Sequence, residues 1–125
     1  VGIIDFQDGL IGHHPDDLVS LLEDARRDVA PELAREMVDL YLTRMRKRRP
    51  GFDVDQCHTD YAILAAQRNA KILGIFARLI TRDGKEKYRS FLPRVAHHFA
   101  RDISRPAVRP LNDWARRHFP ELLTP

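Results

Sequence analysis

Apolar residues recur at helical spacing along most of this chain, and only its first residues follow a strand-like pattern. The run Gly2-Ile3-Ile4 is apolar and β-branched, which predicts a short strand that ends at Asp5. Glycines and a proline between Gly9 and Pro15 predict a loop. From there on, the spacing of apolar residues predicts helices. The expected fold class is therefore mainly α, with one short N-terminal β-strand.

Caps, prolines and glycines divide the helical part into segments that each predict one helix. An aspartate caps the first, and Pro31 suits the first turn of the second. Asp53 and Gln56 form a capping box for the third, a long helix that Asp83-Gly84 ends. The expected ranges are 16 or 17 to 28, 31–49, 53–81, 85–102 with Pro93 as a place where this helix could kink, and 107–118.

The apolar faces of these segments predict which side chains face the core. The third helix is apolar around nearly its whole circumference from Tyr61 to Ile80, which is expected for a helix packed on several sides. In the other helices the residues expected inside are Leu18, Leu21, Leu22 and Ala25; Leu33, Met37, Leu40, Tyr41 and Met45; Tyr88, Phe91, Val95 and Phe99; and Leu111 and Trp114.

Composition fits one globular domain with a core of its own. The chain has 125 residues and a mass of 14.5 kDa, with 43% hydrophobic and 31% charged residues. No apolar run approaches the roughly 18 residues of a membrane helix, and no signal peptide opens the chain, so we expect a cytoplasmic protein without a membrane partner. The single cysteine, Cys57, is expected to be a buried structural thiol.

A basic run at 44–49 is the densest charge cluster of the chain. Such a run can be a localisation signal or a phosphate-binding strip. Here it stands at the predicted end of a helix, just before Pro50, where cations complement the helix dipole, and this reading is favoured. The formal net charge is only +3, so nucleic acid is not an expected partner.

Four polar residues interrupt the apolar part of the long helix: Gln67, Arg68, Asn69 and Lys71. Unpaired polar groups cost several kcal/mol when buried, so each of them needs partners or water. Gln67 and Lys71 are one turn apart and share a face, from which they could contact a ligand with hydroxyl or carbonyl groups. An internal network that locks this helix to its neighbours is the alternative, and the sequence leaves both open.

The N-terminal motif resembles the aminoglycoside phosphotransferase and choline kinase superfamily. It consists of the strand followed by Asp5-Phe6-Gln7-Asp8, a loop with Gly12, and Asp17-Leu18 at the start of a helix. The resemblance implies that Asp5 binds Mg²⁺ and that Asp17 caps its helix and braces the catalytic loop. Asp8 would orient a metal-bound water, contact the sugar, or only complete the turn.

A closer resemblance covers most of the chain. The segments 21–25, 66–78 and 82–85 are similar to those of the bacterial anomeric kinases of N-acetylmuramate and N-acetylglucosamine. This resemblance implies a protein-kinase-like fold and transfer of the ATP γ-phosphate to the anomeric hydroxyl of an amino sugar in cell-wall recycling, with Mg²⁺ as cofactor. The expected substrate-binding residues are Gln67, Arg68 and Lys71.

The chain departs from the superfamily in what it lacks. The ATP-covering loop, the phosphate-pairing lysine and the catalytic loop would all precede Val1. We therefore expect residues 1–125 to be the helical C-terminal lobe, inactive alone and partnered by the N-terminal part of the same protein. Rival readings are an aminoglycoside or choline-type kinase, and a non-catalytic helical interaction module or kinase remnant.

Overall fold

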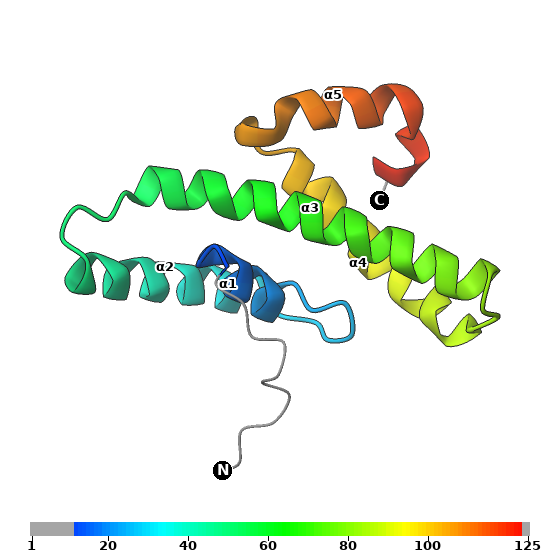
Figure 1. The fold of residues 1–125 in the computed structure, drawn as a ribbon, viewed down its shortest axis with the longest axis horizontal. Helices are drawn as coiled ribbons and strands as arrows, with labels where there is room; N and C mark the ends of the chain where they lie inside the picture. Colours follow the sequence, from blue (N-terminus) through cyan, green and yellow to red (C-terminus); the bar gives the residue numbers. More distant parts are fainter. Residues whose placement is uncertain (1–11, 124–125) are drawn as a thin grey trace, which may run out of the picture.

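The computed structural model describes residues 12–123, and the regular elements of this part are helices (Figure 1). A mainly α fold is thus confirmed for this part of the chain, while the expected strand at 2–4 lies outside the described residues. The α-helices are α1 (Pro15–Leu22), α2 (Pro31–Arg48), α3 (Val54–Thr81), α4 (Leu92–Ile103) and α5 (Arg109–His118). Short 3₁₀ helices η1 (Glu86–Phe91), η2 (Pro106–Val108) and η3 (Pro120–Leu123) join or follow them.

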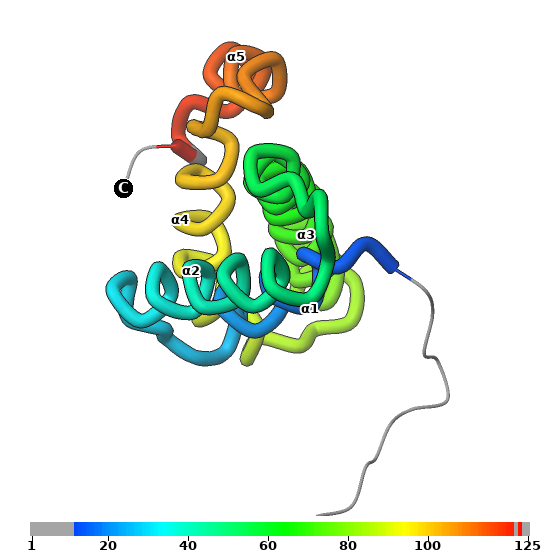
Figure 2. Tube along the Cα trace, turned by 90° about the vertical axis from the view of Figure 1, so that its left-hand side faces the viewer, coloured from blue at the N-terminus to red at the C-terminus, as the bar shows by residue number. Residues whose placement is uncertain are grey.

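The long helix α3 is the centre of the fold. Its first turn is capped by Asp53, whose Oδ1 accepts a hydrogen bond of 2.9 Å from the backbone N–H of Gln56. After Thr81 the chain turns at Gly84, which has a φ of +62° that few other residues adopt. Figure 2 looks nearly along α3 and shows α1 and α2 below it and α4 beside it. The predicted third helix is therefore confirmed.

Two apolar clusters hold the neighbouring helices on α3. The larger one joins α3 to α4, η2 and α5 through Ala66, Phe99, Ile103, Val108 and Ala115. The smaller one joins α1 to α3 through Val19, Tyr61 and Ala65, and Val38 of α2 packs against it. Both clusters include residues of α3, so this helix is shared by the two parts of the core.

The first helix is shorter than predicted. It begins at Pro15 and ends at Leu22 instead of reaching residue 28. Proline fits the first turn because its missing N–H needs no partner there. At the other end, Asp24 Oδ1 accepts a 2.8 Å hydrogen bond from the backbone N–H of Arg26, a local turn that competes with continued helix.

Several leucines predicted to face the core are exposed. The exposed fraction is 58% for Leu21 in α1, and Leu33 and Leu40 in α2 are also exposed, as is Trp114 in α5. Helix α2 instead buries Leu42 and packs Val38 against α3. Apolar residues together span more than half of the circumference of α2, so periodicity alone does not identify its inner face. The residues Val95 and Phe99 in α4 are buried as predicted.

The predicted helix at 85–102 is divided into η1 and α4. Pro93 lies in the first turn of α4, where it starts a helix without kinking one. The half-buried rings of Tyr88 and Phe91 pack on Phe76, with ring centroids 5.0 Å and 6.0 Å from it. The last predicted helix likewise starts with η2 and continues as α5.

Three further expectations concern single features. Cys57 is buried, as predicted. The basic run closes α2, with Arg46, Lys47 and Arg48 exposed in its last turn, so its expected place at a helix end is confirmed. Over the described ranges, no helix has the length and apolar character that crossing a membrane requires.

Candidate functional site

Gln67 and Lys71 lie on the same exposed face of α3, next to the start of α1. They line a hollow of about 250 Å³ whose other lining residues are His13, Asp16, Leu64 and Arg68. The hollow offers an amide, a carboxylate and cationic groups within a small volume. This combination can donate and accept hydrogen bonds to several hydroxyl or carbonyl groups of one small molecule.

The segment that carries Asp5 and Asp8 enters the described structure beside this hollow. Residues 1–11, including both aspartates, lie outside the described residues, and the chain continues from Gly12 to His13 at the edge of the hollow. His13 also approaches Asp60 of α3, with 3.2 Å between Nε2 and Oδ2. His13, which follows the predicted metal residues in the sequence, therefore lies beside the predicted substrate residues of α3.

Arg68 differs from Gln67 and Lys71 because its side chain is half-buried. Its Nε is buried and has no hydrogen-bond partner among the described residues. A buried guanidinium N–H without an acceptor is unfavourable by several kcal/mol unless a ligand, water or another part of the protein satisfies it. This group is the strongest sign in the hollow that a binding partner is missing.

An internal polar network does exist, but it is built on Asn69 and not on Gln67 or Lys71. Asn69 is fully buried, and its Nδ2 donates to Glu23 Oε2 at 2.7 Å and to Asp102 Oδ2 at 2.8 Å. Glu23 Oε1 accepts from the Tyr61 hydroxyl at 2.9 Å and from Arg101 Nη2 at 2.7 Å. The network ties α3 to the end of α1 and to α4.

The sequence pattern did not indicate that two acids of this network, Glu23 and Asp102, would be buried. Glu23 and Asp102 have exposed fractions of 2% and 0%, although each has charged or polar neighbours in sequence typical of a surface position. The available signal was Asn69, a polar residue at a core position of an apolar helix. Its need for partners was predicted, but the partners lie 46 and 33 residues away along the chain.

Asp17 does not cap its helix, so that expectation is wrong. Pro15 starts α1 after His14, which places Asp17 inside the first turn, and no side chain forms a cap hydrogen bond there. The exposed Asp17 carboxylate in the first turn still interacts favourably with the helix dipole. The bracing of a catalytic loop by Asp17 stays a prediction.

Burial changes the ionisation of Asp102. It raises the pKa of this carboxyl to about 7, and the nearby Glu23 carboxylate is the next cause. Burial also raises the pKa of Tyr61, whose hydroxyl therefore remains a donor to Glu23. Asp102 thus takes up a proton near neutral pH.

This raised pKa predicts that stability falls as the pH rises. Between about pH 4 and pH 7 the folded state keeps a proton on Asp102 that the unfolded chain, with an ordinary pKa of 3.8, has lost. The free energy of unfolding, measured by urea denaturation, should therefore decrease over this range, and the decrease should be smaller in Asp102→Asn. Burial also lowers the pKa of His98, which by itself makes stability rise with pH. This effect is the same in the parent and in Asp102→Asn. Equal slopes for parent and variant would contradict the raised pKa.

The described residues contain no group of three or more His, Cys, Asp or Glu side chains arranged to hold a metal ion. The predicted metal ligands Asp5 and Asp8 are outside these residues, so the metal assignment stays a prediction.

Comparison with known proteins identifies bacterial relatives, although no family profile matches the chain. The N-acetylmuramate/N-acetylglucosamine kinase of Caulobacter vibrioides is 42% identical over 120 residues, which are 96% of this chain and 32% of that kinase. The protein of the same name from Neisseria meningitidis is 39% identical over 104 residues, covering 80% of this chain and 30% of that protein. The one from Pseudomonas aeruginosa is 30% identical over 110 residues, or 83% and 31%. The chain is thus similar over most of its length to proteins named N-acetylmuramate/N-acetylglucosamine kinase, and it spans about a third of theirs.

Proposed function

We propose that this chain is the C-terminal part of an ATP-dependent kinase that phosphorylates N-acetylmuramate and N-acetylglucosamine at the anomeric hydroxyl, in the recycling of cell-wall sugars. The observation that carries the proposal is the 42% identity to a kinase of that name over 96% of the chain. The full-length protein would then be about three times as long as this chain and would supply the nucleotide-covering and catalytic loops.

The metal-binding part of this proposal concerns Asp5. A carboxylate is a suitable oxygen ligand for Mg²⁺, and the resemblance to the kinase superfamily gives Asp5 this role. When bound, Mg²⁺ neutralises the charge that develops on the ATP phosphates during transfer. Asp8 would complete the turn or assist Asp5, and Asp17 would brace the catalytic loop.

The sugar-binding part of the proposal concerns the hollow on α3. Gln67 can donate to and accept from sugar hydroxyls and can donate to the acetamido carbonyl, while Lys71 supplies three donors on the same face. Arg68 brings a buried Nε that has no acceptor among the described residues. A sugar bound here would lie beside His13, eight residues after Asp5 in the sequence.

The test is ATP-dependent phosphorylation by the full-length protein. We expect release of ADP only when the magnesium salt of ATP and one of the two amino sugars are both present, measured in a coupled assay. Choline and an aminoglycoside serve as alternative acceptors. If ADP is released with choline or the aminoglycoside and not with the amino sugars, the substrate is not an amino sugar of the proposed kind.

Replacing Gln67 or Lys71 by alanine should raise the KM for the sugar more than the KM for ATP, because each change removes contacts to the sugar alone. Loss of one hydrogen bond to a neutral group corresponds to about a threefold to tenfold increase in KM. Steady-state kinetics with each substrate varied in turn measure both constants.

Arg78→Ala is the matched control, since Arg78 is exposed on the same helix but does not line the hollow. It should leave both KM values within twofold of the parent. An unchanged sugar KM together with a lower melting temperature in Gln67→Ala and Lys71→Ala would show that these residues act in the packing of α3.

A further inference from the structure

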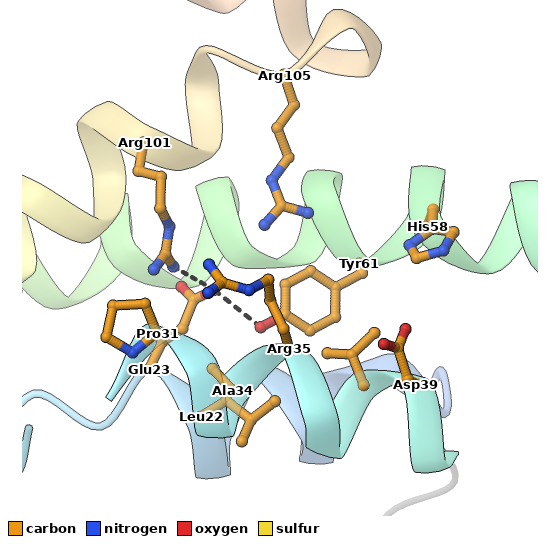
Figure 3. A pocket seen from close by; sticks show the side chains of 11 residues that line it. Leu22, Glu23, Pro31, Ala34, Arg35, Asp39, His58, Tyr61, Arg101 and Arg105 are labelled. Carbon is orange, nitrogen blue, oxygen red and sulfur yellow. Dashed lines mark hydrogen bonds and ion pairs between the residues drawn. The ribbon is translucent and has the colours of Figure 1, made fainter. Parts of the chain in front are cut away.

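A second hollow lies between α2, α3 and α4, away from the residues proposed to bind the sugar. It has a volume of about 340 Å³, which is the size of a small-molecule site. Its floor is formed by the polar network described above, at Glu23 and Tyr61 (Figure 3). The charged and titratable residues that line it are Glu23, Arg35, Asp39, His58, Arg101 and Arg105.

Three guanidinium groups reach this hollow from different parts of the fold. Arg35 comes from α2, Arg101 from α4, and Arg105 from the link between α4 and η2. Figure 3 shows their head groups pointing toward the space above the Glu23 carboxylate and the Tyr61 ring. Convergent arginines are the usual way in which proteins bind carboxylates and phosphates, because the planar guanidinium can donate two parallel hydrogen bonds.

Glu23 holds two of these arginines in place. Its Oε1 pairs directly with Arg101 Nη2 at 2.7 Å. The same oxygen accepts from the hydroxyl of Tyr61, and the Cζ of Arg105 lies 5.1 Å from the centroid of the Tyr61 ring. Because Glu23 is almost fully buried, the core fixes its position, and Glu23 in turn orients Arg101 through their ion pair.

The charge of Arg105 is not compensated by an acid. No ion pair joins Arg105 to a carboxylate among the described residues, and its guanidinium lies over the Tyr61 ring. In the same described part of the chain, Arg35 pairs only with the exposed Glu32 at 3.1 Å, an interaction that water screens strongly. The carboxylates of the lining are Glu23, which Arg101 already uses, and Asp39. A ligand that brings a negative charge would therefore complete this site.

From this arrangement we propose that the second hollow binds a small molecule through its carboxylate or phosphate group, held by Arg35, Arg101 and Arg105. Arg105 and Arg35 contact the anion from opposite walls, and Arg101 contacts it from the floor. The site is separate from the hollow with Gln67 and Lys71, and the proposal does not depend on the kinase activity proposed above.

The test is calorimetric titration of the full-length protein with inorganic phosphate and, separately, with N-acetylmuramate, which carries a carboxylate. N-acetylglucosamine is the neutral control: it has no anionic group, so any binding at the proposed sugar site should be the same in the parent and in Arg105→Gln. We expect at least one of the two anions to bind the parent and to bind Arg105→Gln at least tenfold more weakly. If Arg105→Gln weakens the binding of phosphate alone, the ligand group of this site is a phosphate. If it weakens the binding of N-acetylmuramate alone, the ligand group is a carboxylate.

Two more variants make the result decisive. Arg109→Gln removes an exposed arginine outside the hollow and should bind both anions within twofold of the parent. Arg35→Gln changes the other wall at an exposed position, so it should fold normally and weaken the same anion at least threefold. The proposal is overturned if neither anion binds the parent protein. It is also overturned if Arg35→Gln and Arg105→Gln, both folded, bind both anions as tightly as the parent does.

Discussion

Glu23→Ala should lower the free energy of unfolding by about 2–4 kcal/mol, less than breaking a fully buried ion pair would cost, because the Arg101 side chain is 41% exposed. The change removes the acceptor of the Tyr61 hydroxyl, and it leaves Asn69 and Arg101 with Asp102 as their remaining acidic partner. The cost is substantial because Tyr61 and Asn69 are buried, so water cannot fully replace the lost carboxylate. Urea denaturation of parent and variant measures the difference.

Glu32→Ala is the matched control for this prediction. Glu32 is also a glutamate paired with an arginine, but the side chains of Glu32 and Arg35 are 71% and 69% exposed. Surface pairs of this kind contribute about 0–1 kcal/mol. If Glu23→Ala changed the free energy of unfolding no more than Glu32→Ala does, the network would not be what ties α1 and α4 to α3.

Asp5→Asn in the full-length protein should reduce kcat for sugar phosphorylation by about a thousandfold or more, since the loss of a metal-binding carboxylate removes several kcal/mol of transition-state stabilisation. An asparagine keeps the size of the side chain and removes its charge, so the far-ultraviolet circular dichroism spectrum should not change. Rates of ADP formation at saturating ATP and sugar give the effect.

Asp55→Asn is a suitable comparison for Asp5→Asn, because Asp55 is an exposed carboxylate in the first turn of α3. Its replacement should leave kcat within about twofold, as expected for a surface substitution. Activity of Asp5→Asn within threefold of the parent would remove Asp5 from the metal site.

Local signals in the sequence predicted the elements of the fold that local interactions determine. The capping box at Asp53 and Gln56 marked the start of α3, and Gly84 marked its end, because both depend on residues only a few positions apart. The end of α1 was missed because a turn at Asp24 stops it, although the apolar spacing continues to Ala25. The inner face of α2 was not identified because its apolar residues form a stripe too broad to indicate one side.

In the candidate sites, too, local patterns in the sequence predicted some features, whereas contacts between distant segments could not be predicted. That Gln67 and Lys71 share a face follows from helical periodicity, and the structure places both in one hollow. Asn69 was recognised as a residue that needs partners, but no local rule could identify Glu23 and Asp102, which reach it only through the packing of α1 and α4 on α3. The three arginines of the second hollow come together for the same reason, because Glu23 and Tyr61 position two of them.

The most direct test of the proposed function is the identity of the product. The full-length protein would be incubated with magnesium, ATP and N-acetylglucosamine, and the product examined by phosphorus–proton correlation spectroscopy. An anomeric kinase should give a new phosphorus signal that correlates with the anomeric proton of the sugar. A phosphorus signal that correlates with another sugar proton, or no new sugar phosphate at all, would contradict the proposed function.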